Sequence, residues 1–596
     1  MSSAVWAAPS SVVRPDSHVR GRIVDVLVLV GFVAAGVLLY RDLWWHLDSG
    51  YLAYAGQDQN MWEWFFAVTA ENVLTLSNPL HTDLQNFPLG VNLMANTAML
   101  GFGVPLTPVT VLFGPTVTWT LTLSGGIAAT AFAWYWLLSR YIVDGRGAAV
   151  LGASVAAFAP PIVSHANAHP NFVVLLVIPL LVHRLVLLAR GERPVHHGVI
   201  LGLLAAFQVF VGEESLLIAA VAMVVFAVVY ALSRPAEVAA MVRPMATGVA
   251  VGGAVAAVLV AVPLWWQFAG PQSYQGIEHG LNGNDLAAFT AYASNSLAGS
   301  EESAVELSMN RTEENAFFGW PLILVLVAVT VALWRVALAR AVAVSMFVMA
   351  WISMGVLLVV HGEGTSIPGP WMALYDAPLL DAVLESRFAL ACAPLAGILL
   401  AMATQRVLGL RWQAEWRHFA QVSWCGALVV ALVPIMPMAL PVGARDEVPE
   451  FFASGQWQNH VRDGRAVTIV PLPSAGYADP LHWQVDQGLE FRLSEGYFVG
   501  PGEDGGGVYG AQRTPTSELL AEVDETGMAT TVGEAEREQA VEDLRYWHSD
   551  VVALRDDHPN VVPLRATVEQ LLGNSGRQQG GMWIWNTTSL TQPSGN

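Results

Sequence analysis

Eleven stretches of this sequence are apolar over lengths that reach or approach the width of a lipid bilayer, and this feature limits the possible folds more than any other. They cover residues 23–40, 117–138, 148–163, 171–189, 198–212, 214–232, 246–268, 317–334, 341–360, 388–404 and 419–440. A helix that crosses a bilayer needs about 20 predominantly apolar residues. Only 13% of the residues are charged, against roughly a quarter in soluble domains. The sequence therefore predicts a polytopic α-helical membrane protein with about eleven transmembrane helices and excludes a soluble enzyme.

A twelfth apolar stretch, Thr97 to Phe113, is shorter and contains Pro105 and Pro108, which disrupt helix interiors. Loops rich in arginine usually lie on the cytoplasmic side of the membrane. All arginine clusters of this chain fall on the same side as the N-terminal tail only if this stretch does not cross the membrane. These clusters are Arg140 with Arg146, Arg190 with Arg193, Arg234 with Arg243, Arg335 with Arg340, and Arg406, Arg411 and Arg417. We therefore predict a multi-pass plasma-membrane protein with a cytoplasmic tail (residues 1–22), a transmembrane domain (23–440) and an extracytoplasmic C-terminal domain (441–596).

The predicted C-terminal domain has a different composition from the transmembrane part. Short apolar stretches near residues 467–472, 497–499, 550–554 and 582–585 are typical of strands, and polar stretches at 517–524, 534–544 and 567–572 are typical of helices. This alternation predicts an α/β domain. The domain carries 10 Arg against 23 Asp and Glu, so nucleic acid is not expected as a partner.

The first predicted outer loop, residues 41–116, is rich in acidic and aromatic side chains. Aromatic residues at this density are typical of a membrane interface, so we expect Gln59 to Leu76 to form an interfacial helix. Asp58 at its start has two interpretations that are compatible. It can cap the helix, or it can serve as a general base at the membrane edge. Glu63 and Asp83 are further catalytic candidates in the same loop.

Two predicted outward turns also carry polar side chains. His165 and His169 lie four residues apart, a spacing that can bind a metal on a helix, although the neighbouring prolines argue against a regular helix and no third ligand is near in sequence. The pair can instead be structural or contact a substrate phosphate, and metal dependence is left open. Glu213 and Glu214 form either a solvated turn or part of a substrate cavity, because acids at membrane depth usually face a cavity or a partner.

Cationic residues are scarce on the predicted outer face. Arg387 precedes an apolar stretch there, where its side chain can either reach lipid headgroups or bind the phosphate of a lipid donor. Arg41 and Arg311 are the other outward arginines near the bilayer. The sequence contains no phosphate-binding GxxxxGK[ST] loop, no GxSxG elbow, no CxxC pair and no HExxH helix, which counts against nucleotide-dependent and serine-hydrolase functions.

This arrangement resembles the integral-membrane glycosyltransferases of the GT-C superfamily, in particular a bacterial branch of it. The resemblance covers most of the chain and rests on a few short motifs, namely Gly56-Gln57-Asp58, Trp62 to Phe66, Asn78-Pro79 to Asn92, and Ile367-Pro368 to Ser386-Arg387-Phe388. It implies a sugar donor linked to polyprenyl phosphate, with Asp58 as the leading base. Relatives often have paired acids at this point, whereas here Gln59 and Asn60 follow Asp58.

The resulting hypothesis is a hexosyl- or pentosyltransferase that moves a sugar from a polyprenyl-phosphate donor to a glycan or lipid acceptor of the cell envelope, on the outer face. The expected substrate-binding residues are Arg41, His165, His169, Glu213, Glu214, Arg311 and Arg387. The alternatives are a lipid or polysaccharide transporter or flippase, which would need polar residues at mid-membrane, and a noncatalytic membrane protein of envelope assembly.

Overall fold

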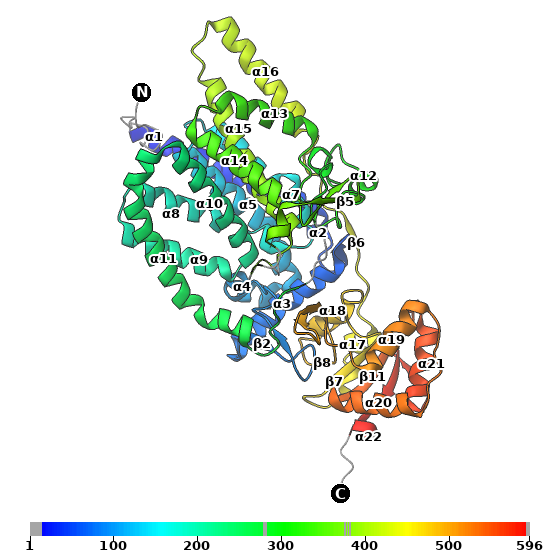
Figure 1. Ribbon diagram of the computed structural model, residues 1–596. Helices are drawn as coiled ribbons and strands as arrows, with labels where there is room; N and C mark the ends of the chain where they lie inside the picture. The colour runs from blue at the N-terminus through cyan, green and yellow to red at the C-terminus, as the bar shows by residue number, and fades with distance from the viewer. Residues whose placement is uncertain (1–14, 278–282, 375–376, 378–379, 381–382, 592–596) are drawn as a thin grey trace.

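A computed structural model describes residues 15–277, 283–374, 377, 380 and 383–591. The chain forms a large helical bundle followed by a smaller α/β domain, which lies beside one end of the bundle (Figure 1). Arg14, part of the predicted tail, and residues 592–596 of the predicted C-terminal domain fall outside the described residues.

Each of the eleven predicted spans corresponds to a helix of the bundle. Six apolar segments are long enough to cross a membrane, namely Gly21–Leu39, Pro115–Tyr141, Pro170–Ala189, Glu213–Ser233, Pro235–Ala269 and Glu385–Leu408. They include α1 (Pro15–Leu39), α5 (Pro115–Tyr141), α8 (Val177–Ala189), α10 (Glu213–Ser233), α11 (Pro235–Ala269) and α15 (Cys392–Leu408). The other predicted spans coincide with α6 (Arg146–Phe158), α9 (Pro194–Val209), α13 (Trp320–Leu333), α14 (Ala337–Ile352) and α16 (Ala414–Leu432). The number of crossings stays a prediction.

The expectation that the prolines would break the stretch before α5 is wrong. Helix α4 (Leu100–Phe113) runs through both Pro105 and Pro108. Hydroxyl groups on the helix supply additional hydrogen bonds, since Thr107 donates to the carbonyl of Gly103 and Thr110 to that of Leu106. Proline is tolerated inside helices of membrane proteins because side-chain hydroxyls, neighbouring helices and local adjustments of the backbone compensate for the lost bonds.

Two predicted spans end earlier than expected. Helix α14 ends at Ile352, and residues 357–360 instead form strand β4 (Leu357–Val360), which pairs with β5 (Glu363–Pro368). Helix α16 ends at Leu432. Apolar composition continues past both ends, which is why the sequence alone did not reveal them.

Small residues let several helices of the bundle approach each other closely. A Cβ atom on Gly152 of α6 would lie 2.6 Å from the carbonyl oxygen of Gly397 on α15. Gly198 and Gly202 of α9 face Gly248 and Gly252 of α11 in the same way. This four-residue spacing of small residues is typical of helix packing in membranes.

The first outer loop folds back into the protein. It contains α2 (Arg41–Trp45), β1 (Gly50–Leu52), α3 (Gly56–Thr75), β2 (His81–Thr82), β3 (Val91–Asn92) and α4. The aromatic residues of α3 do not face a membrane interface as expected, because Trp62, Trp64, Phe65 and Phe66 are buried within the protein. The indole of Trp64 donates to Gln484 of the C-terminal domain at 2.6 Å. The aromatic residues of this helix therefore form a core.

The C-terminal domain has the predicted α/β architecture. Its sheet has the order β12-β13-β11-β7-β8. Strands β7 (Ala466–Val470), β8 (Arg492–Leu493) and β11 (Ser549–Arg555) are parallel to one another. Strand β13 (Met582–Asn586) pairs antiparallel with β11, and β12 (Arg577–Gln579) pairs antiparallel with β13. Helices α19 (Pro515–Thr526), α20 (Glu534–Tyr546) and α21 (Val561–Leu572) cover one face. Residues 497–498, expected to begin a strand, precede β9 (Val499–Pro501), which forms a separate hairpin with β10 (Gly507–Tyr509).

The second face of the sheet joins the core of the first outer loop. Val467, Ile469 and Val551 belong to the same buried cluster as residues of α3. Strand β6 (Val442–Ala444), just after the bundle, pairs with β1 of the loop. Contact between domain and loop is therefore extensive, and it brings the domain to the site described below.

The orientation of the bundle makes a testable prediction. The side chain of Asp25 in α1 pairs with Arg140 and with Arg146, so the basic ends of α5 and α6 lie beside the first part of α1, as the cytoplasmic assignment requires. We expect a reporter fused after Arg193 to be cytoplasmic and one fused after Gly443 to be external. An external signal at Arg193 or a cytoplasmic signal at Gly443 would contradict this topology.

Candidate active site

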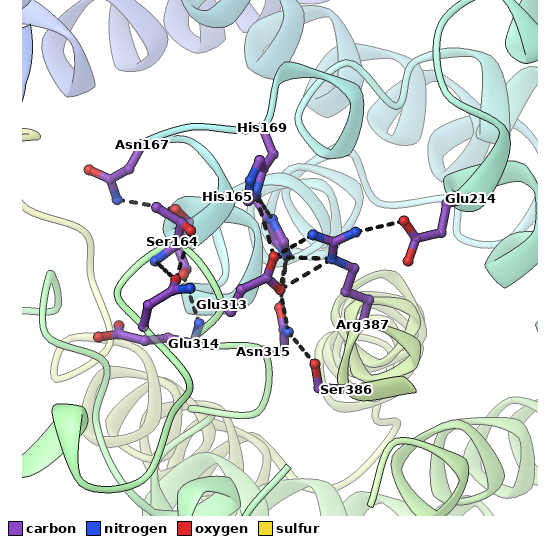
Figure 2. Close-up of polar contacts among 12 residues, drawn as sticks. Ser164, His165, Asn167, His169, Glu214, Glu313, Glu314, Asn315, Ser386 and Arg387 are labelled. Carbon is purple, nitrogen blue, oxygen red and sulfur yellow. Dashed lines mark hydrogen bonds and ion pairs between the residues drawn. The ribbon is translucent and has the colours of Figure 1, made fainter. Parts of the chain in front are cut away.

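Four segments that are distant in sequence meet in one polar cluster (Figure 2). They are the turn after α7 (Pro160–His165), the loop at residues 311–315, the 3-10 helix η4 (Glu385–Ala391) and the first turn of α10. The structure brings together His165, His169, Glu214 and Arg387, all of which the sequence analysis selected. It adds Glu313, Asn315 and Ser386 to them.

Arg387 lies between two carboxylates. Its Nη2 donates to Oε1 of Glu313 at 2.5 Å, and its Nη1 donates to Oε2 of Glu214 at 2.7 Å. The guanidinium carbon lies 4.9 Å from the ring centre of Phe172. The alternative in which Arg387 reaches outward to lipid headgroups is therefore wrong, and so is the solvated position for Glu214. These two pairs leave one N–H on each terminal nitrogen of the guanidinium without a bond to these carboxylates.

The two histidines contact each other through their Nδ1 atoms, which are 2.9 Å apart. Nε2 of His165 lies 2.8 Å from Oδ1 of Asn315. Because an amide oxygen only accepts, Nε2 of His165 carries the proton in the neutral ring, and its Nδ1 accepts from His169. Burial lowers the pKa of both rings to about 4, so both histidines are neutral near pH 7.

Glu313 supplies the third ligand that the sequence did not place near the histidine pair. Its carboxylate oxygens lie 3.6 Å from Nδ1 of His169 and 3.7 Å from Nε2 of His165. One ligand atom from each of these three residues falls within a group less than 4.8 Å across. Two imidazoles and a carboxylate are a common ligand set for a divalent cation such as Zn²⁺, which binds them at about 2.0–2.2 Å. The spacing therefore fits a metal ion.

The charges of the site also fit a cation. Asp58, Glu214 and Glu313 supply three carboxylates, and Arg387 supplies one positive charge. With both histidines neutral, the fully ionised cluster carries two negative charges in excess, and burial together with the charge of Glu313 raises the pKa of Asp58. Buried charge without a partner is costly. A divalent cation held by His165, His169 and Glu313 would neutralise the excess, and it would displace the proton shared by the two rings.

Asp58 approaches this cluster from the first outer loop. Helix α3 begins at Gly56 after Ala55, with no side-chain cap, so the capping role of Asp58 is wrong. Its Oδ1 accepts a hydrogen bond of 2.8 Å from the hydroxyl of Tyr497. Burial raises the pKa of Asp58, whereas His169 and the bond from Tyr497 lower it. Asp58 thus lies within electrostatic range of His169, Glu313 and Arg387.

The C-terminal domain contributes directly to this region. Tyr497 is buried, and burial together with the adjacent Asp58 raises the pKa of its phenol, so it donates its proton rather than ionising. The hairpin of β9 and β10 brings Tyr509 within electrostatic range of Arg387, Glu313 and Asp58. The backbone of this hairpin bonds to the outer loop of the bundle, with Gln275 donating to Gly505.

The structure places the other predicted site residues in separate contacts. Buried Glu63 accepts from Arg445 at 2.8 Å, and Asp83 accepts from Arg492 at 2.9 Å. Both acids therefore join the outer loop to the C-terminal part of the chain. Glu213 accepts from Gln267. Arg311 pairs with Glu301 and stacks over Tyr54, and Arg41 pairs with its neighbour Asp42.

Sequence reasoning missed Glu313, Asn315, Ser386 and Tyr497 as site residues. The adjacent acids Glu313 and Glu314, followed by Asn315 and then an apolar stretch, were a usable signal. Tyr497 had none, because its partner Asp58 lies 439 residues away in the sequence.

The helical bundle and the α/β domain together form the GT-C type of fold, as the sequence resemblance implied, and six segments of the described residues are long and apolar enough to cross a membrane. The solved arabinofuranosyltransferase AftD from Mycobacteria has this fold, with a TM-score of 0.54 and 14% sequence identity over 95% of this chain and 41% of that one. Two further solved structures are similar. The oligosaccharyltransferase AglB from Archaeoglobus fulgidus matches with a TM-score of 0.49 and 12% identity over 95% of this chain and 74% of its own.

ArnT from Cupriavidus metallidurans matches with a TM-score of 0.41 and 11% identity over 97% of this chain and 100% of its own. No protein-family model matches the chain, and no curated protein matches its sequence.

Proposed function

We propose that this chain is a membrane glycosyltransferase that moves a sugar from a polyprenyl-phosphate donor to a hydroxyl group of an envelope glycan or lipid. The observation that carries this proposal is the buried cluster in which Asp58 lies within electrostatic range of His169, Glu313 and Arg387 and accepts a hydrogen bond from Tyr497. It combines a carboxylate suited to accept a proton with a cation, Arg387, suited to a leaving phosphate. The GT-C fold, shared with an arabinofuranosyltransferase, supports the proposal.

In the proposed reaction, the acceptor oxygen attacks the anomeric carbon while the bond from that carbon to the phosphate oxygen breaks. The carboxylate of Asp58 accepts the proton of the acceptor hydroxyl, and the bonding electrons leave with the phosphate. Arg387 faces the developing negative charge with the N–H groups that Glu214 and Glu313 leave unused. A divalent cation held by His165, His169 and Glu313 would supply further positive charge when bound.

The donor class can be tested with the purified full-length chain in lipid vesicles. We expect turnover of a sugar on polyprenyl phosphate and none of the same sugar on a nucleoside diphosphate, because the described residues include no phosphate-binding loop of the nucleotide type. Turnover of the nucleotide sugar alone would contradict the proposed donor.

Tyr497→Phe should change the pH dependence of transfer. The bond from Tyr497 lowers the pKa of Asp58, so its loss raises that pKa. A general base acts in its ionised form, and activity therefore rises with pH through its pKa. We expect the acidic limb of the pH–rate profile to move to higher pH in Tyr497→Phe, with activity recovering in alkaline buffer.

Tyr546→Phe is the matched control, since Tyr546 lies in α20 of the same domain and, among the described residues, forms no hydrogen bond with Asp58. An unchanged acidic limb in Tyr497→Phe would mean that Tyr497 does not act through Asp58.

A further inference from the structure

A second polar cluster lies at the opposite end of the bundle from Asp58. Helix α8 starts a few residues after His169 and runs away from it for 13 residues, which is roughly 20 Å at 1.5 Å per residue. Its far end meets the ends of α5 and α9. The cluster there, which we call the basic cluster, consists of Tyr141, His183, Arg184, Arg190 and His197.

Contacts within the basic cluster hold its cations in place. The hydroxyl of Tyr141 lies 2.8 Å from Nε2 of His183, and the guanidinium of Arg190 lies 5.0 Å from the ring centre of Tyr141. Arg184 donates to Nδ1 of His197 at 3.3 Å. Arg184, Arg190 and His197 are all close enough to His183 for their charges to act on it.

The positive charge of the cluster lacks a matching carboxylate. Within the part of the chain that the structure describes, neither Arg184 nor Arg190 forms an ion pair. The exposed Glu192 is close enough for its negative charge to act on one member of the cluster, His197. This situation differs from that of Arg140 and Arg146 nearby, which both pair with Asp25.

Three buried nitrogens of the cluster also lack a hydrogen-bond partner. They are Nε of Arg184, Nε of Arg190 and Nδ1 of His183. When Tyr141 donates to Nε2 of His183, the proton of that ring is on Nδ1, so all three nitrogens are donors without an acceptor. A buried donor left unsatisfied costs about 1–3 kcal/mol. Donors and cations together favour an anion as the ligand.

We infer that the basic cluster binds a phosphate group, carried by an anionic lipid headgroup in the membrane leaflet at this end of the bundle. Guanidinium groups match phosphate oxygens in geometry, and basic pockets between transmembrane helices at this level bind anionic headgroups. The neighbouring helix α9 carries exposed apolar side chains, Val195, Leu203 and Phe207, along its length. They provide a surface for the acyl chains, which favours a lipid over a soluble phosphate. The site is independent of the proposed transferase function.

The test compares lipid binding by the full-length chain and by the double variant Arg184→Gln/Arg190→Gln, using native mass spectrometry and melting temperature. The probes are phosphatidylglycerol, phosphatidylcholine and inorganic phosphate. Each arginine near an anionic headgroup strengthens binding roughly fivefold, so we expect the wild type to prefer phosphatidylglycerol by at least tenfold and the double variant to lose that preference. Arg411→Gln, which removes one exposed charge on the same predicted side, should behave like the wild type.

Equal binding of both lipids by the wild type, or an unchanged preference in the double variant, would overturn the inference. If inorganic phosphate raises the melting temperature of the wild type but not of the variant, and no lipid preference exists, the phosphate group is confirmed and its source is a soluble ligand. Should the double variant fail to fold, Arg190→Gln alone is expected to weaken the preference several-fold, and an unchanged preference there would again overturn the inference.

Discussion

Asp58→Asn should reduce the rate of sugar transfer by roughly 10²- to 10⁴-fold while the protein remains folded. General-base catalysis typically contributes a factor of this size. Asparagine keeps the size of the side chain, and its amide oxygen can still accept the hydrogen bond from Tyr497, but it cannot take up the acceptor's proton. The measurement is transfer from a polyprenyl-phosphate sugar, made next to the melting temperature of the same preparation.

Asp48→Asn provides the control for this experiment. Asp48 is exposed in the same outer loop, and its replacement should leave transfer within about twofold of the wild type, as for most surface substitutions. Near-normal transfer by Asp58→Asn would remove Asp58 from the mechanism. Equal losses in both variants would show that the loop, rather than the carboxylate, is responsible.

Glu313→Gln should have the largest effect on stability. Arg387 pairs with the carboxylates of Glu214 and Glu313, and the substitution leaves it with that of Glu214. It also removes one of the three candidate metal ligands. Breaking a buried ion pair by removing one partner costs about 3–5 kcal/mol. We expect a lower melting temperature and the loss of bound divalent metal, measured by elemental analysis after dialysis against Zn²⁺ or Mn²⁺. Glu302 is exposed and, like Glu313, lies between α11 and α13. Glu302→Gln should change neither the melting temperature nor the amount of bound metal.

The stability difference between wild type and Glu313→Gln should depend on pH. Arg387 and the histidines hold the pKa of Glu313 below its ordinary value of 4.5 despite its burial. A lowered pKa in the folded state contributes stability that is present above the unfolded value and is lost as the pH falls toward the folded one. The difference in melting temperature should therefore be constant at neutral pH and shrink below about pH 4.5. A difference that stays constant under acid conditions would mean that the carboxylate charge is not what stabilises the protein.

The fold was largely predictable because its main elements depend on local composition. Apolar length predicted the helices of the bundle, and alternating apolar and polar stretches predicted β7, β11 and β13 and the three covering helices. Strands β8 and β12, of two and three residues, were missed. The environment predicted for the aromatic side chains of α3 was wrong. A dense aromatic sequence has the same pattern at a membrane interface and in a core between two parts of the protein.

The site was predictable only in part, because it depends on contacts between distant segments. His165, His169, Glu214 and Arg387 were identifiable from polar residues next to apolar stretches. Their mutual contacts were not, since Arg387 lies 173 residues from Glu214. Likewise, the sequence offered Glu63 as a catalytic candidate equal in kind to Asp83, and only the partner Arg445, 382 residues away, reveals the buried ion pair of Glu63.

The central claim is that the cluster around Asp58 and Arg387 transfers a sugar from a lipid phosphate rather than moving the lipid across the membrane. The most direct measurement follows a radiolabelled sugar on polyprenyl phosphate in vesicles that contain the purified wild-type chain and a hydroxyl-bearing glycan acceptor. The account predicts that the label leaves the lipid for the acceptor, that free polyprenyl phosphate appears in equal amount, and that Asp58→Asn stops both. If instead the label stays on the lipid while the lipid changes leaflet, the chain is a transporter and the account is wrong.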